Sequence, residues 1–250
     1  LSNNNASYET SAYGATILTS VGNPVGVFYG YTTDGVFSTT KEANDAALYQ
    51  LDETGNKVFF QAGDMKFVDR DGNHCIDDAD RVIIGDPNPD IYGNIFTTLA
   101  YKRFRLDVNF NYSLGNDVYN YMRSQLEGGS RFMNQTTALT RRWQTEGQVT
   151  AIPKATFQDP MGNSRFSDRW IEDGSYLRLK TVTLSYRLPV NSTLLQGFEF
   201  WVQANNLLTF SKYLGSDPEF SMTSNVIGQG IDLGQLPQSR SFVAGVKINL

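Results

Sequence analysis

Strict alternation of apolar and polar residues is the clearest feature of this chain. In the stretch RFRLDVNFNYSLG, every second residue from 104 to 114 is apolar and every residue between is polar. Successive side chains of a strand point to opposite faces, so this period predicts a β-strand with one apolar and one polar face. The chain is therefore predicted to be all-β and antiparallel. The same pattern recurs in residues 91–101, 176–189, 197–210 and 241–250.

The connections between these predicted strands are of two very different lengths. Residues 102–103 form a tight hairpin, and residues 189–196 form a second short turn, at Pro189. Residues 38–90, 116–170 and 211–240 are long polar excursions. Transmembrane barrels of the outer membrane have short turns at one end and long extracellular loops at the other. The pattern therefore predicts strands of a large transmembrane β-barrel, with further strands expected upstream of Leu1 to close it.

The remaining segments show weaker patterns. Residues 6–20 are predicted as one strand that ends in the turn Gly22-Asn23-Pro24, and residues 26–38 as a strand pair or a bent strand. The charged and Ala-containing residues 39–61 predict one short helix. The segments NYMRSQLEGG and TTALTRRWQTEG predict two short amphipathic helices inside the long excursion 116–170.

A water-soluble β-sandwich also alternates, so the barrel has a competitor. The polar positions are mainly Asn, Thr, Ser, Arg and Asp, which suit a hydrated lumen, and Leu250 completes a strand. Aromatic residues near strand ends suit a membrane interface. They are Phe104, Tyr112, Tyr186, Phe198, Phe210 and Phe242. The alternative is a soluble secreted glycan-binding sandwich with a calcium-stabilised loop, and a glycosidase is a third possibility.

Composition and charge remove several classes of function. The chain has 250 residues, 13% aromatic residues, 22 Gly and a net charge of −5, without a basic cluster that would suit nucleic acid. Cys75 is the only cysteine and His74 the only histidine, which excludes an intramolecular disulfide, a His-dependent triad and a multi-His zinc site. Apolar runs stay well below the roughly 18 residues of a transmembrane helix, and barrel strands need only about 9–11 alternating residues.

An acidic stretch, DRDGNHCIDDAD at residues 69–80, fits a twelve-residue calcium loop. Alternate oxygen ligands can turn inward around one large hard cation. His74 stands where such loops usually have Gly, and the last ligand position holds Asp instead of Glu. The competing interpretation is a solvated acidic turn held by Asx-type hydrogen bonds. The predicted metal ligands are Asp69, Asp71, Asn73, the Cys75 carbonyl, Asp77 and Asp80.

Four blocks of the chain, in order, resemble one known family. They are GNPVGVFYGYTTDGVF, AGDMKFVDRDGNHCIDDADRVIIGDPNPDIYGNI, WIEDGSYLRLKTVTLSYRLP and GIDLGQLPQSRSFVAGVKINL. Together they are similar to the C-terminal part of SusC/RagA-type TonB-dependent outer-membrane transporters. The family's acidic loop commonly has Gly at the position of His74, and its last residue is often Phe where this chain has Leu250.

This resemblance implies a barrel of about 22 strands with a plugged lumen. Residues 1–250 would form its C-terminal portion, without the plug, the TonB-contacting segment and the earlier strands. Members pair with a SusD-like surface lipoprotein and import oligosaccharides or peptides with energy delivered through TonB.

The function expected from the sequence is therefore nutrient import across the outer membrane of a Gram-negative bacterium. It is binding and gated translocation, with no catalytic residues and no organic cofactor. Sugar rings stack on exposed aromatic side chains, which predicts substrate contacts in the long excursions. The candidates are Tyr119, Tyr121, Trp143 and Tyr213.

Overall fold

The structure, a computed structural model, describes residues 7–190, 197–220 and 228–249. Its contacts divide the chain into two compact units. The loop unit comprises residues 1–88, 117–172 and 221–234, and the sheet unit comprises residues 89–116, 173–220 and 235–250. Within the described residues, every helix is too short or too polar to cross a membrane.

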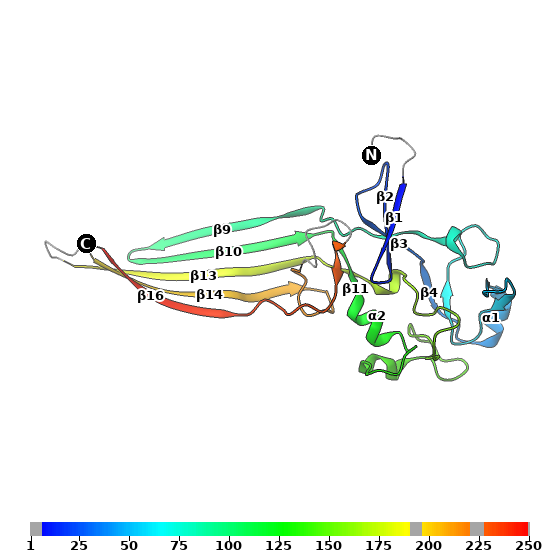
Figure 1. The fold of residues 1–250 in the computed structure, drawn as a ribbon. Helices are drawn as coiled ribbons and strands as arrows, with labels where there is room; N and C mark the ends of the chain where they lie inside the picture. The colour runs from blue at the N-terminus through cyan, green and yellow to red at the C-terminus, as the bar shows by residue number, and fades with distance from the viewer. Residues whose placement is uncertain (1–6, 191–196, 221–227, 250) are drawn as a thin grey trace. The chain divides into compact units, whose positions relative to one another are not determined.

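The sheet unit is one antiparallel sheet of long strands (Figure 1). Its order is β16-β14-β13-β10-β9, so strands that follow one another along the chain are neighbours in the sheet. The bounds are β9 Ile91–Tyr101, β10 Phe104–Leu114, β13 Tyr176–Pro189, β14 Gly197–Ser211 and β16 Ser241–Asn249. These strands confirm the prediction from alternation, while Leu250 and most of the turn predicted at 189–196 lie outside the described residues. Lys102 enters the left-handed region with φ 54°, as a two-residue hairpin requires.

The register places the apolar residues of all five strands on one face. Leu99 pairs with Leu106, Leu106 with Leu184, Leu184 with Val202, and Val202 with Ala244. Within the described residues no second layer covers this face, since Leu184 is 43% and Val202 53% exposed. A β-sandwich would bury these positions, so the exposed face favours the barrel prediction.

A β-bulge keeps the two faces separate along β13 and β14. The register skips Lys180 on β13 and both Asn206 and Leu207 on β14, and Asn206 takes a left-handed conformation with φ 52°. After the bulge Leu208 pairs with Leu179, so the apolar residues return to their face. This accounts for Leu207, which departs from the alternation in the sequence.

The loop unit contains short strands in several small sheets, not one large sheet. The sheets are β1-β2-β3-β8, β12-β11-β15, β4-β7 and β5-β6. Their bounds are β1 Ser7–Ala12, β2 Ala15–Ser20, β3 Val27–Gly30, β4 Thr33–Val36, β5 Tyr49–Leu51, β6 Lys57–Phe59, β7 Met65–Phe67, β8 Val82–Gly85, β11 Asp117–Asn120, β12 Ile171–Asp173 and β15 Ile231–Asp232. The strand predicted over residues 6–20 is in fact a hairpin, because Tyr13 and Gly14 both take positive φ and reverse the chain.

The helices of the loop unit agree with two of the three predictions. Helix α1, Thr40–Ala46, begins where the Thr39 side chain accepts a hydrogen bond from the Glu42 N–H. Helix α2, Tyr121–Glu127, lies in the first predicted segment of the long excursion. The second segment forms only a short 3-10 turn, η2 (Thr137–Arg141). The other 3-10 turns are η1 (Asp78–Asp80) and η3 (Asp168–Trp170).

Two hydrophobic cores hold the loop unit together. One contains Phe37, Phe60 and Phe67, and the other contains Phe28 and Trp170. Both join residues that are far apart in the sequence, and Trp170 is fully buried. Almost all of the excursions 38–90 and 116–170, residues 38–88 and 117–170, therefore belong to a folded unit with its own core.

Candidate functional site

The acidic loop lies between β7 and β8, and its first carboxylate organises the turn. Asp69 accepts hydrogen bonds from the backbone N–H groups of Gly72 and His74, both at 2.8 Å. His74 takes the left-handed conformation expected at this position, with φ 63°. This conformation costs a residue with a Cβ roughly 1 kcal/mol or more. The hydrogen bonds to Asp69 must therefore stabilise the turn by more than the strain at His74 costs.

Three of the predicted ligands converge. Carboxylate oxygens of Asp69, Asp71 and Asp80 all lie within 4.8 Å of one another. Asp80 is fully buried and accepts hydrogen bonds from the backbone N–H groups of Arg70 and Asp77, at 2.7 and 2.9 Å. Asp77 instead caps η1, where its side chain accepts the Ala79 N–H. The prediction that Asp77 turns inward with the others is not met by this geometry.

The other two predicted positions stabilise the turn. The Asn73 side chain donates to Asp71 at 2.9 Å and accepts the Cys75 N–H at 2.5 Å. The Cys75 side chain is buried. These Asx-type hydrogen bonds are those of the competing, metal-free interpretation. The convergence of three carboxylates described above is the geometry that the calcium interpretation requires.

Electrostatics keep the loop negatively charged at neutral pH. Partial burial acts to raise the pKa of Asp69, but the N–H groups of His74 and Gly72 outweigh it, and the net pKa lies below its usual range. The twelve residues 69–80 contain five Asp and one Arg. Carboxylates this close repel one another unless a cation balances them, and hard oxygen ligands suit Ca²⁺. The residues present therefore fit a calcium ion.

Two of the four predicted stacking residues are buried, contrary to the expectation that they offer exposed rings. Tyr119 stands in β11, and its ring packs edge-on against Phe28 and Phe166 in a core. Tyr213 is buried as well. Burial leaves neither ring an exposed face on which a sugar could stack.

The other two predicted residues are half-buried. Tyr121 contacts the rings of Tyr13 and Tyr119 with centroid distances of 5.7 and 6.2 Å. Trp143 packs against the first core and donates from Nε1 to the Ser38 carbonyl at 3.1 Å. Both retain partial access to solvent, so the prediction of substrate contact stays open for them.

The analysis of the sequence did not single out an exposed aromatic pair in the loop unit. Phe132 and Phe157 stack on each other with ring centroids 4.6 Å apart. Both lie in short stretches without apolar periodicity, SRFMNQ and KATFQDP. Their position outside any apolar period was the signal in the sequence that they would be exposed, because such aromatic residues have no local core to join.

The polar face of the sheet unit carries a second aromatic feature. Trp201 pairs with Gly245 across β14 and β16. A Cβ at position 245 would stand only 2.6 Å from the Trp201 ring, so the missing side chain lets the indole cover the backbone. Glycine at this position is required by the neighbouring ring.

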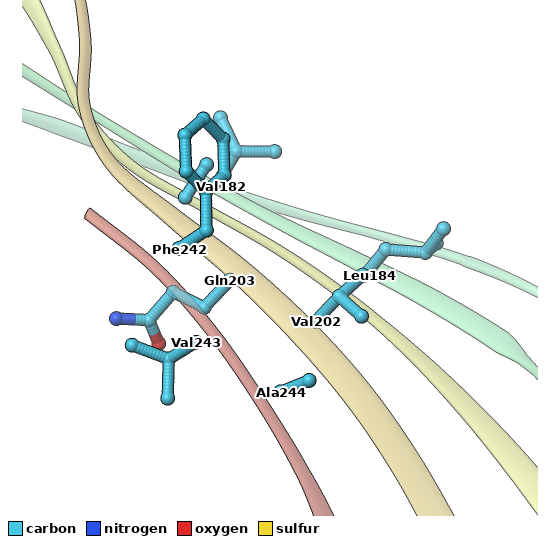
Figure 2. Close-up of a pocket in the computed structure, with 8 residues that line it drawn as sticks. Val182, Leu184, Val202, Gln203, Phe242, Val243 and Ala244 are labelled. Atoms are coloured by element: carbon cyan, nitrogen blue, oxygen red, sulfur yellow. The ribbon is translucent and has the colours of Figure 1, made fainter. Parts of the chain in front are cut away.

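Figure 2 shows a shallow apolar groove on the sheet, where Leu184, Val202 and Ala244 lie on three neighbouring strands. Gln203 and Val243 point away from them toward the opposite face. Consecutive residues of β14 thus face opposite environments, as the alternation in the sequence predicts.

Known proteins show the same fold and related sequences. No protein-family model matches the chain. TonB-dependent receptor P3 of Formosa agariphila is 33% identical over 235 residues, which cover 91% of this chain and 22% of the relative. TonB-dependent receptor SusC of Bacteroides thetaiotaomicron is 27% identical over 214 residues, covering 82% of this chain and 19% of the relative. The resemblance to the SusC/RagA family is thereby confirmed.

Solved structures show the same fold. The RagAB peptide importer in its closed-closed state matches 99% of this chain and 25% of that chain, with a TM-score of 0.69 and 24% identity. At this identity the match shows the fold. The chain spans about a fifth to a quarter of the length of these relatives. The relatives are named receptors and importers, not enzymes, in line with the expectation that this chain carries no catalytic site.

Proposed function

We propose that this chain supplies barrel strands and folded extracellular loops of a TonB-dependent importer in the outer membrane of a Gram-negative bacterium. The observation that carries this proposal is the continuous, uncovered apolar face of the sheet unit, backed by a polar face. Strand backbones can cross lipid only when every N–H and C=O is paired in a closed sheet. Five strands in register, apolar on one side only, suit the wall of such a barrel.

The names of the relatives support a substrate class and a partner for the whole protein. The RagAB structures are named as a peptide importer, and SusC is named as a TonB-dependent receptor. By analogy, the whole protein takes up peptides or oligosaccharides together with a SusD-like surface lipoprotein, with TonB supplying the energy. Tyr121 and Trp143, which are half-buried, are the remaining candidates for substrate stacking.

Calcium would serve this importer in a structural role. Asp69, Asp71 and Asp80 would hold the ion, and it would neutralise the carboxylates that the turn brings together. Because Asp80 is buried in the loop unit and Asp69 follows β7, the ion would tie η1 to that strand.

The proposal is tested by a matched pair of arginine substitutions in the full-length receptor. Val202→Arg places a charge on the apolar face, and Gln203→Arg places the same charge on the polar face of the same strand. A charge at the lipid-facing midplane costs roughly 2–4 kcal/mol. We expect Val202→Arg to reduce the heat-modifiable receptor in the outer membrane strongly, while Gln203→Arg assembles normally. Equal behaviour of the two variants would refute a lipid-facing side.

A further inference from the structure

Phe132 and Phe157 form an aromatic knob on the loop unit. Phe132 is 90% exposed and Phe157 is 56% exposed, and their rings stack with an interplanar angle of 29°. Met133, next in the chain, is exposed too. Large apolar side chains exposed together on a folded surface mark an interaction site more often than an accident of packing.

The backbone beneath the knob is held in a strained conformation. Gln158 and Asp159, directly after Phe157, both take positive φ, at 64° and 48°. The Asp159 carboxylate accepts the N–H groups of Asn163 and Ser164, each at 2.7 Å. The Gln158 N–H donates to the Ser130 carbonyl at 2.9 Å, which ties the two strained residues to the segment that carries Phe132.

This arrangement ties together the backbone segments that carry the two rings. Backbone strain persists only where surrounding contacts enforce it, and it concentrates at functional positions. A rigid aromatic anchor loses little conformational freedom on binding, which is how interface hot spots gain affinity.

The segment that carries the knob is basic in an acidic chain. Residues 128–157 contain four basic residues and one acidic residue, a net charge of +3, whereas the whole chain carries −5. Lys154 is engaged by Asp64 at 3.2 Å, but Arg131 is exposed directly beside Phe132. A surface that complements the knob would therefore carry acidic residues around its apolar centre.

The shape of the knob selects a protein over a small substrate. Small-molecule sites are concave, whereas a phenyl ring that is 90% exposed protrudes. Phe also lacks the polar group with which Tyr or Trp would meet sugar hydroxyls. We propose that the Phe132–Phe157 knob inserts into an apolar, acid-rimmed pocket of a partner protein, namely the surface lipoprotein of the importer. This inference rests on the proposed function.

The first experiment asks what covers the knob. The full-length receptor, produced in the outer membrane with its lipoprotein, carries the photo-reactive p-benzoylphenylalanine in place of Phe132. A matched variant carries it in place of Phe59, which is 52% exposed in β6 of the same unit. We expect a cross-linked adduct with the lipoprotein from position 132 and none from position 59. An adduct within the receptor itself, no adduct, or equal adducts from both positions would overturn the inference.

The second experiment measures the energy of the contact. The purified receptor in detergent is titrated with the lipoprotein for wild type, Phe132→Ala with Phe157→Ala, Arg131→Glu, and Phe59→Ala as the control. Hot-spot truncation predicts a loss of affinity of about 30-fold or more for the double variant. We expect Arg131→Glu to weaken binding less, with a smaller salt dependence, and Phe59→Ala to bind as wild type.

The outcomes separate this inference from the function on which it rests. Unchanged lipoprotein affinity in the double variant, with transport intact, contradicts the inference that the knob binds the lipoprotein. It is still consistent with the proposed function as an importer. Unchanged affinity with lost uptake assigns the rings to substrate and also overturns that inference. A wild-type receptor that binds no lipoprotein contradicts the proposed partnership itself. Heat-modifiability of each variant shows that the barrel has assembled.

Discussion

The sheet unit and the loop unit place their apolar side chains in opposite environments. In the sheet unit the apolar side chains form an uncovered face, with Leu184 and Val202 exposed. In the loop unit large apolar residues such as Phe28 and Trp170 are enclosed in cores built from distant segments. One chain thus contains a part suited to hydrocarbon as solvent and a part that folds as soluble domains do. An apolar residue therefore forms an exposed face in the sheet unit, whereas it forms a buried core in the loop unit.

The largest effect is expected from a substitution at a core residue of the loop unit, which should unfold that unit and spare the sheet unit. Trp170→Ala removes a fully buried indole, which the Arg169 guanidinium covers at 4.2 Å. Truncation of a buried Trp costs about 3–5 kcal/mol, so the loop unit should lose its fold. Limited proteolysis of the full-length receptor should then cut within residues 117–172, while the heat-modifiable barrel persists.

The control for this prediction is Phe59→Ala, because that ring is exposed and its loss leaves no cavity. Loss of the barrel together with the loop unit in Trp170→Ala would show that the two units fold as one. Unchanged resistance to protease would show that the Trp170 core contributes little.

An intermediate effect is expected at the glycine of the polar face. Gly245→Val should clash with the Trp201 ring and destabilise the sheet by roughly 1–3 kcal/mol, as overpacking does. The temperature at which the full-length receptor loses heat-modifiability should fall. Combining it with Trp201→Ala should restore part of the loss, because residues in contact are not additive.

The matched control for Gly245→Val is Ala244→Val, one residue away on the exposed apolar face. It should leave the transition temperature close to that of wild type. Equal losses in the two variants would contradict a specific contact between Trp201 and Gly245.

The smallest expected effect concerns calcium and only the loop unit. Chelation with EGTA should increase proteolysis near residues 65–85 of the full-length receptor, since a ligand stabilises the state that binds it. Asp71→Asn should abolish this calcium dependence. Asp45→Asn, an exposed carboxylate on α1, should retain it.

Proteolysis that is insensitive to EGTA in wild type would favour the metal-free interpretation of the acidic turn. A calcium effect that extends to the transition temperature of the barrel would contradict the assignment of the ion to the loop unit alone.

How far the sequence predicted the structure depended on the range of the contacts. The long strands β10 and β13 were predicted within their observed bounds, because a period of two is a local property. The hairpin of β1 and β2 was mistaken for one strand, since Tyr13 gives no sign in the sequence of its positive φ. Tyr119 was taken for an exposed ring, although only contact with the distant Phe28 and Phe166 determines its burial.

The candidate site also has features that short-range sequence patterns predict and features that they do not. The acidic loop was recognisable because its carboxylates are close in sequence, yet the capping of η1 by Asp77 depends on local backbone geometry that spacing does not encode. The stacking of Phe132 on Phe157 joins residues 25 positions apart, which no local pattern reports.

The sequence by itself determined the strands of the sheet unit, their two faces and the position of the acidic loop. It could do so because alternation and ligand spacing act between residues a few positions apart. Only the tertiary structure decided which aromatic residues are enclosed and which protrude, since enclosure depends on what distant segments bring to the same place.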